Sequence, residues 1–142
     1  MSIKEQQDEL VEEFAMFDDW MDKYEYIISL GKELPLIDED KKVEQNIIKG
    51  CQSRVWLDAQ MEDGKVRFKA DSDAIITKGI ISLMIRVLDN SSPNEIINEE
   101  LYFIDQIGLK EHLSPTRSNG LVSMVKQMKM YALAFQTQLK NG

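Results

Sequence analysis

Cys51 is the residue whose type and position could do chemistry, and it is the single cysteine among 142 residues. Gly50 precedes it, and glycine permits backbone angles and close approaches that other residues do not. Residues 54–59, which follow, alternate between polar and apolar side chains and therefore predict a strand. The thiol is thus predicted on a loop that enters a strand, where it can reach solvent or a partner. A cysteine in mid-strand would instead be expected to be buried filler.

Two features near Cys51 could favour the thiolate, which is the reactive form of cysteine. Lys49 and Arg54 are cations close to it in sequence, and a bend that contains glycine offers unpaired backbone amides. Neither feature is specific to reactive cysteines. Residue type and position alone therefore leave an inert, structural Cys51 as open as a reactive one.

Three other groups of residues could also take part in chemistry. Asp71 and Asp73 have the spacing of paired carboxylates, but helix capping explains them better because a metal site needs several convergent ligands. His112, the sole histidine, could carry a proton near a thiolate, yet nothing in the sequence places it beside Cys51, so a polar surface role is expected. Arg117 lies in the first turn of a predicted helix, where a cation opposes the helix dipole. Arg117 is therefore a candidate for pairing with a carboxylate, the cysteine loop or a partner. Among these, a structural ion pair is the expected role.

Long helices at both ends of the chain are predicted to frame the thiol. Apolar residues repeat at spacings of three and four over residues 4–30 and again over residues 115–139, which predicts one amphipathic helix in each segment. These two helices are expected to pack together. A third helix is predicted to run to residue 89 from N-caps at residues 71–73, and its Gly79 indicates close packing against another element.

The middle of the chain predicts a β-hairpin that follows a long loop. Residues 53–60 and 65–70 alternate as strands, and the intervening Asp63-Gly64 is typical of a tight turn. Because two strands alone are marginal, the hairpin must pack on helices or recruit a third strand, for which residues 45–49 are a weak candidate. Residues 36–50 are predicted to form a loop that contains at most one helical turn and is anchored by its isoleucines. The loop is expected to determine how far the Cys51 sulfur can move.

Charge and composition exclude several function classes. The formal net charge is −8, and residues 1–44 carry 14 acidic against 5 basic residues, whereas residues 45–142 carry 11 against 12. This balance disfavours nucleic acid as a partner, because phosphate binding needs a concentrated basic surface. The acidic third is interpreted as a solvated face, although docking to a basic patch is compatible with it.

The same composition predicts one globular domain over residues 1–142. No apolar run is long enough to span a bilayer and the N-terminus is unlike a secretory signal, so no membrane association and a cytoplasmic location are expected. One cysteine cannot form an internal disulfide and fits a reducing compartment.

Three separated blocks of the sequence resemble the SufE family of sulfur-acceptor proteins. The blocks are Gly50-Cys51-Gln52-Ser53 with Val55-Trp56, then Asp71-Ser72-Asp73-Ala74 with Lys78-Gly79, then Leu113-Ser114-Pro115-Thr116-Arg117-Ser118 with Gly120-Leu121. They follow the order and compatible spacing of the family, and the resemblance covers residues from about 10 to 135. The CsdE type, the nearest relative within the family, carries similar blocks.

The resemblance implies that Cys51 takes a sulfane sulfur, as a persulfide, from a PLP-dependent cysteine desulfurase of the SufS or CsdA kind and stimulates that enzyme. The sulfur would then pass to a cluster-assembly scaffold of the SufB type. The implied supporting residues are Gly50, Gln52 and Ser53 in the cysteine loop, and Asp73 and Arg117 for partner docking or loop positioning. No cofactor or metal site is expected in this chain, since PLP belongs to the desulfurase. The protein would be a monomeric or homodimeric carrier rather than an enzyme.

The expected fold is α+β, with a small antiparallel sheet against long N- and C-terminal helices. The resemblance implies a third strand and an architecture similar to the IscU scaffold proteins. A cluster scaffold needs several thiolate ligands and this chain has one, so we expect it to carry sulfur rather than hold a cluster. Three alternatives stay open: a CsdE-type carrier that serves another acceptor, a thiol redox protein that forms sulfenic acid at Cys51, and an adaptor whose cysteine is incidental.

Overall fold

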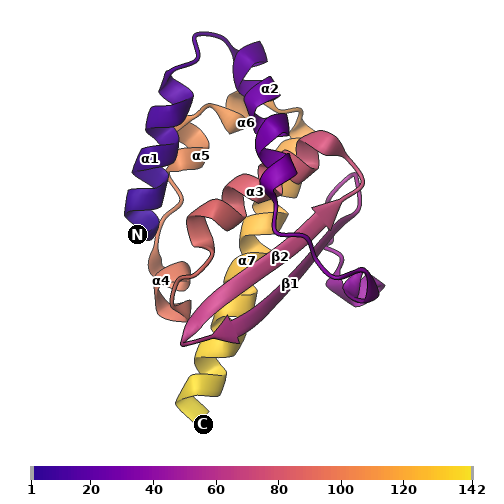
Figure 1. Ribbon diagram of the computed structural model, residues 1–142, viewed down its shortest axis with the longest axis vertical. Helices are drawn as coiled ribbons and strands as arrows, with labels where there is room; N and C mark the ends of the chain where they lie inside the picture. Colours follow the sequence, from indigo (N-terminus) through magenta and orange to yellow (C-terminus); the bar gives the residue numbers. More distant parts are fainter. Residues whose placement is uncertain (1, 142) are drawn as a thin grey trace.

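The structure, a computed structural model, describes residues 2–141 and has the α+β fold that the sequence predicts (Figure 1). Seven α-helices and a two-stranded sheet account for its regular elements within those residues, together with three short 3-10 helices. In chain order these are α1 (Ile3–Ala15), α2 (Trp20–Leu30), η1 (Gly31–Glu33), η2 (Glu39–Lys41), η3 (Glu44–Asn46), β1 (Val55–Glu62), β2 (Lys65–Ser72), α3 (Ile75–Leu88), α4 (Pro93–Asn98), α5 (Phe103–Gln106), α6 (Leu109–His112) and α7 (Pro115–Asn141).

The two strands form the predicted antiparallel hairpin. Their register runs from Val55 opposite Ser72 to Glu62 opposite Lys65. Asp63 and Gly64 connect them with φ of 53° and 78°, and two positive φ values are the signature of the type I′ turn that matches strand twist. The inward-facing residues of both strands are buried, so one face of the hairpin closes the core.

The third strand that the family resemblance implied is reduced to isolated bridges within the described residues. Ile47 bridges Trp56 on the outer side of β1, and Leu36 bridges Ala70 on the outer side of β2. The segment between these bridges forms two 3-10 turns, where the sequence indicated a loop with one helical turn. Ile48 is buried in the core, so the loop is anchored just before the cysteine, as predicted.

The N-terminal helix is divided in two, whereas the sequence predicted one helix over residues 4–30. The Asp19 side chain accepts a hydrogen bond from the amide of Asp22 at 2.9 Å and caps α2. Phe14 and Tyr26 then meet edge to face across the turn, with ring centroids 5.3 Å apart. The apolar period continues through the turn, so periodicity alone does not reveal that the chain reverses there (Figure 1).

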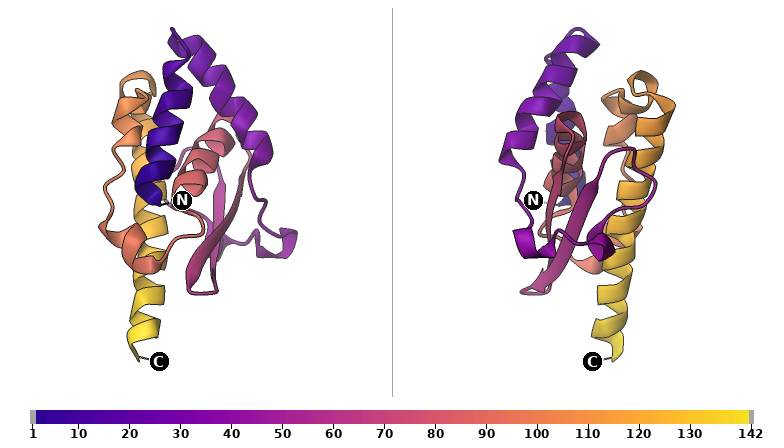
Figure 2. Two further views of the ribbon diagram at one scale, coloured as in Figure 1. Left: turned by 60° about the vertical axis from the view of Figure 1, so that its left-hand side comes forward. Right: turned by 90° about the vertical axis from the view of Figure 1, so that its right-hand side faces the viewer.

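Helix α3 lies at the centre of the molecule, between α1 and α2 on one side and α7 on the other (Figure 2). The expectation that the N- and C-terminal helices pack on each other is therefore wrong. Ten of the 14 residues of α3 are buried, which explains its broad apolar face. A Cβ on Gly79 would lie 2.3 Å from the carbonyl oxygen of Ile27, so this glycine permits the close crossing of α2 and α3 that the sequence indicated.

The last helix begins where the sequence predicts, at Pro115, after Ser114 accepts a hydrogen bond from the amide of Arg117 at 3.3 Å. Met124 and Met128 face the core as expected, while Met130 is exposed. None of the helices formed by residues 2–141 combines the length and apolar character that crossing a lipid bilayer requires.

Candidate functional site

Cys51 lies at the end of the long loop, before β1 begins at Val55, as the sequence predicts. Gly50 turns the chain with φ of 92°, a conformation that side-chain-bearing residues rarely adopt. A Cβ at this position would also lie 2.6 Å from Ser123 Oγ on α7. The backbone angle therefore favours glycine immediately before the cysteine, and the contact with Ser123 adds less, because that hydroxyl can rotate away.

The thiol rests directly on the surface of α7. Cys51 Sγ is 3.7 Å from the carbonyl oxygen of Gly120, and a Cβ on Gly120 would be 3.4 Å from the sulfur. Gly120 thus leaves the helix surface bare where the cysteine loop crosses it. Gly120 was not predicted as a site residue. A glycine inside a predicted helix costs about 1 kcal/mol relative to alanine, and this cost is a sequence signal of close approach.

A cavity of about 230 Å³ opens beside Cys51, between the cysteine loop, the start of α3 and the first turns of α7. A water molecule occupies roughly 30 Å³ of liquid, so a single added sulfur atom is small in comparison. Cys51 is half-buried at the wall. The lining combines hydroxyl, amide and apolar groups with one cation: Cys51, Gln52, Ser53, Ala74, Thr77, Ile80, Thr116, Arg117, Gly120 and Met124.

Burial raises the pKa of the Cys51 thiol above its usual value, because the charged thiolate loses solvation. The neighbouring cations do not offset this effect in the resting structure. Lys49 is 78% exposed and lies 3.9 Å from Glu44, to which it turns its ammonium group. Lys49 therefore does not hold Cys51 as a thiolate in this conformation, and burial favours the neutral thiol.

The chain just after Cys51 is fastened to α3 and to the end of β2. Ser53 Oγ donates a hydrogen bond to Thr77 Oγ1 at 3.1 Å. The amide of Arg54 donates to Asp73 Oδ1 at 3.1 Å, and the amide of Asp73 donates to the Arg54 carbonyl at 3.3 Å. Asp73 therefore holds the exit of the loop and does not cap α3, whose N-cap residue makes no side-chain hydrogen bond. It is exposed and lies outside the cavity lining.

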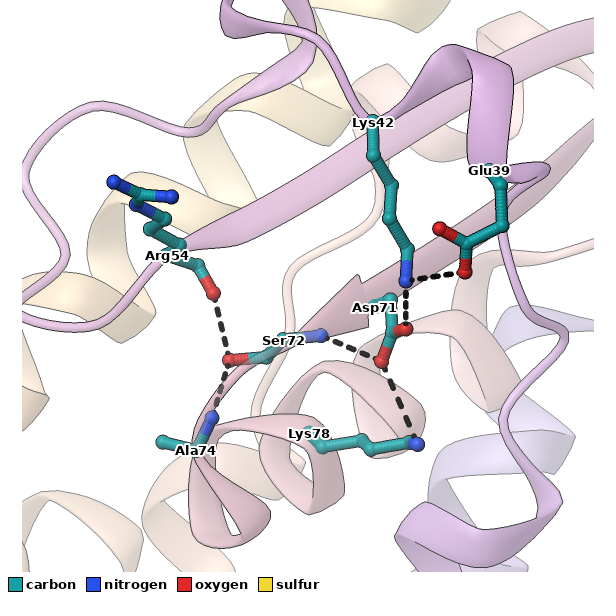
Figure 3. Close-up of polar contacts among 7 residues, drawn as sticks. All are labelled: Glu39, Lys42, Arg54, Asp71, Ser72, Ala74 and Lys78. Carbon is teal, nitrogen blue, oxygen red and sulfur yellow. Dashed lines mark hydrogen bonds and ion pairs between the residues drawn. The ribbon is translucent and has the colours of Figure 1, made fainter.

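Asp71 connects the chain ahead of Cys51 to the same corner of the molecule (Figure 3). Its carboxylate lies 2.7 Å from Lys42 Nζ and 3.5 Å from Lys78 Nζ, and Lys42 also pairs with Glu39 at 2.9 Å. Burial opposes ionisation of Asp71, but Lys42, the Ser72 amide and Lys78 outweigh it and lower its pKa.

These four charged residues, Glu39, Lys42, Asp71 and Lys78, are called the Asp71 cluster below. The expected capping role of Asp71 is wrong, because its oxygens are taken up by this cluster and by the Ser72 amide. Within residues 2–139, no three His, Cys, Asp or Glu side chains converge as they would around a metal ion.

Arg117 lies at the cavity wall with an exposed side chain. The expected structural ion pair is not formed with any residue in the described part of the chain. The cation is therefore available to a partner or to a charge that develops in the cavity. His112 instead stacks on Trp20, with ring centroids 4.6 Å apart and planes 13° from parallel, and it lies outside the cavity lining.

Fold and site together define an α+β protein that presents one thiol from an anchored loop beside a small, mixed-polarity cavity. Residues 8–132 match the family model described as "SufE: Fe-S metabolism associated domain". The protein belongs to the SufE family, as the three sequence blocks indicated. Membership supports a role in sulfur transfer, together with a cysteine desulfurase, in iron–sulfur metabolism.

Relatives agree with this assignment, and a solved structure shares the fold. An uncharacterized SufE-like protein of Synechocystis is 39% identical over 127 residues, which is 89% of this chain and 80% of that protein. An uncharacterized SufE-like protein of Rhizobium meliloti is 37% identical over 130 residues, covering 88% and 93%. The solution structure of a hypothetical protein from Thermus thermophilus superposes with a TM-score of 0.77 at 21% identity, covering 93% of this chain and 96% of that one, and shows that the fold is shared.

Proposed function

We propose that Cys51 accepts a sulfane sulfur from a PLP-dependent cysteine desulfurase of the SufS type, stimulates that enzyme, and passes the sulfur to an iron–sulfur cluster scaffold of the SufB type. The observation that carries the proposal is the placement of the sole cysteine, half-buried on a loop, beside a cavity with space for an added sulfur. PLP is assigned to the desulfurase, and this chain is a carrier and activator.

The transfer step is a thiol–persulfide exchange with no net oxidation. The Cys51 thiolate attacks the outer sulfur of the desulfurase persulfide, a new S–S bond forms, and the donor S–S bond breaks. The donor cysteine leaves as a thiolate, and Cys51 carries the outer sulfur. The proton lost from Cys51 passes to the departing thiolate or to solvent, so atoms, electrons and charge balance.

Because the loop is anchored, this exchange requires a change in the surroundings of Cys51. At rest, burial holds Cys51 as a neutral thiol on α7, a state that reacts slowly because the nucleophile is the thiolate. Reaction requires the thiol to leave the cavity or to meet cations that the partner supplies. Arg117, exposed at the cavity wall, is a residue of this chain that can stabilise the developing sulfur anion or contact the partner.

Intact-protein and peptide mass spectrometry test the proposal directly. The protein is incubated with a desulfurase from the same source, PLP and cysteine, without reductant after the reaction, and desulfurase turnover is recorded. We expect one added sulfur at Cys51 and faster turnover. The Cys51→Ser variant should fold normally, take up no sulfur and give no acceleration.

A relocated thiol provides the matched control. Cys51→Ser combined with Ser29→Cys keeps one cysteine but moves it to an exposed position on α2. We expect this variant to remain unmodified, because transfer needs the docked position and not merely an accessible thiol. Sulfur uptake by folded Cys51→Ser, or equal uptake by the relocated cysteine, contradicts the proposal; peroxide reactivity without any response to the desulfurase favours the redox alternative.

A further inference from the structure

Helix α7 also borders an open groove on the side away from Cys51. The groove has a volume of about 550 Å³ and lies between α7 and the chain segment from α4 to α6. Its lining is almost entirely apolar apart from three lysine side chains. The residues that form it, called the α7 groove below, are Ile97, Leu101, Ile104, Lys110, Leu121, Val122, Val125, Lys126, Lys129, Met130 and Leu133.

The exposed apolar side chains of the α7 groove form a stripe along one helix face. Val122, Met130 and Leu133 are 55%, 53% and 53% exposed. The α7 residues of the groove extend from Leu121 to Leu133, about 18 Å at 1.5 Å per residue. This length accommodates about three turns of an added helix, and a cleft between two helical walls is a common site for one.

The α7 groove and the cysteine cavity lie on opposite sides of the same helix. The α7 residues that line the cysteine cavity are Thr116, Arg117, Gly120 and Met124. The α7 residues that line the groove lie on the helix face whose centre is near Lys129. At about 100° per residue, the centres of these two sets are roughly half a turn apart around α7. A partner in the α7 groove would therefore leave Cys51 accessible.

The charges around the α7 groove indicate which kind of segment fits it. Its lining contains three lysines and no aspartate or glutamate, on a chain whose net charge is −8. Lys126 is exposed and has no ion pair within residues 2–139, and Lys110 lies 3.7 Å from Asp105 in a solvent-exposed pair. Lys129 donates to the carbonyls of Ile96, Ile97 and Glu99 and so fixes the end of α4 as the opposite wall.

A second copy of the chain is a poor occupant of this groove. A two-fold contact through α7 would bring the lysines of one groove against those of the other, and like charges disfavour it. Docking of a different surface of a second copy would be head to tail, and such contacts continue into filaments unless the rotation closes a ring. The groove is better suited to a different protein.

We propose that the α7 groove binds an amphipathic helix of a partner protein, with apolar side chains against Val122, Met130 and Leu133 and carboxylates against Lys110 and Lys126. This surface works independently of Cys51. It would allow one partner to stay bound while the thiol exchanges sulfur on the other side of α7, so the inference adds to the proposed function without resting on sulfur chemistry.

Two synthetic 16-residue peptides test the docking surface. One carries leucines at helical a and d spacing flanked by glutamates, and the other replaces every glutamate with lysine. Binding to the full chain is measured by fluorescence anisotropy and mapped by amide chemical shifts. We expect the acidic peptide to bind at least about tenfold more tightly than the basic one, a difference of about 1.4 kcal/mol, with shifts along residues 121–133.

Three variants locate the contact. Lys126→Glu should weaken the acidic peptide about fivefold or more and strengthen the basic one, and Met130→Glu should weaken both, since a charge then enters the apolar stripe. Met21→Glu, at a 64%-exposed position on α2, is the matched control and should change neither affinity. Circular dichroism confirms that each variant is folded.

The outcomes separate this inference from the proposed function. Cys51→Ser should bind the acidic peptide like the wild type, whatever its sulfur uptake. Absence of binding, equal affinity for both peptides, insensitivity to Lys126→Glu and Met130→Glu, or shifts centred on residues 50–54 would each overturn the proposal. Concentration-dependent dimerisation that Met130→Glu abolishes would assign the groove to a second copy instead.

Discussion

At the scale of single residues, Cys51 is a neutral and slowly reacting thiol at rest, and it becomes reactive only when its surroundings change. Burial raises the thiol pKa, and the group of α7 that contacts the sulfur is the carbonyl oxygen of Gly120, which carries no positive charge. A thiolate-dependent exchange is therefore slow until the environment changes. The activating charge must come from Arg117, from loop movement or from the partner.

The raised pKa of Cys51 predicts how the rate of its alkylation depends on pH. Because the folded pKa is raised, the thiolate fraction at pH 7–8 should be smaller than in an unfolded chain, and the iodoacetamide rate should rise over a pH range above that of an ordinary cysteine, whose pKa is about 8.5. Mass spectrometry follows the rate from pH 6 to 10. The urea-unfolded protein is the control, and a folded-state midpoint at or below the unfolded one would contradict the burial argument.

The residue that does the chemistry was predictable, while its supporting contacts were only partly so. A single cysteine after glycine and before a strand is visible in the sequence. Gly120 was also visible as a glycine in a helix, but its partner was not, because sequence spacing does not show which loop crosses a helix. The role of Thr77 could not be predicted for the same reason. A buried threonine in a helix is interpreted as a core residue unless its hydrogen bond with Ser53 is known.

At the scale of secondary-structure elements, the loop ahead of Cys51 depends on the end of β2. The Asp71 cluster joins η2 and the residue after it to β2 and α3, and Lys42 also lies over the Trp56 ring, 5.5 Å from its centroid. The Asp71 side chain is only 14% exposed, so its charge is poorly replaced by solvent. Loss of this charge should free the loop.

We expect Asp71→Asn to destabilise the protein by about 1–2 kcal/mol and to speed amide exchange in residues 39–54, because Lys42 and Lys78 lose their shared carboxylate. Alkylation of Cys51 should become faster as the loop opens. Urea unfolding and hydrogen–deuterium exchange measure the two effects. Asp105→Asn removes an exposed pair with Lys110 and should change stability by less than about 0.5 kcal/mol. Equal exchange in the loop of both variants would refute the anchoring role.

The elements show where periodicity is informative. It correctly predicted the hairpin, α3 and α7: a tight turn ends the strands, Ser114 and Pro115 mark the start of α7, and the apolar face of α3 is broad enough to be recognised although its predicted caps are wrong. It missed the break between α1 and α2 because aromatic side chains keep the period on both sides of Asp19. A capping aspartate within an apolar repeat is therefore stronger evidence for a helix end than the repeat is for continuity.

At the scale of the whole molecule, the order of the helices could not be read from their apolar faces. An amphipathic stripe shows that a face is buried, but it does not name the partner, and α3 has apolar residues on enough of its surface to serve helices on both sides. The small residues at the crossings carry more information. Gly79 specifies a close crossing, although only the structure identifies α2 as the neighbouring helix.

The stability of the whole molecule should also pass through a maximum as the pH changes. Groups with lowered pKa values limit it on the acid side, and groups with raised pKa values limit it on the alkaline side. The hydrogen bond and charge of Arg86 lower the pKa of Glu13 despite its partial burial, and the pKa of Asp71 is lowered as well. Burial raises the pKa of Cys51, and burial together with the Glu13 hydrogen bond raises that of Tyr26. The two carboxylates stabilise the fold above their unfolded pKa values, whereas the thiol and phenol stabilise it below theirs.

Stability should therefore fall as the pH drops below about 4–5, where the unfolded carboxylates take up protons, and as it rises above about 8.5–10, where the unfolded thiol and phenol lose theirs. Urea midpoints from pH 3 to 10 measure the curve. Glu13→Gln should lower stability at pH 7 and flatten the acid limb, because Arg86 loses its ionic partner at every pH. Cys51→Ser should flatten the start of the alkaline limb and leave the acid limb unchanged. An acid limb that keeps its full slope in Glu13→Gln would show that the Arg86 pair does not couple to folding.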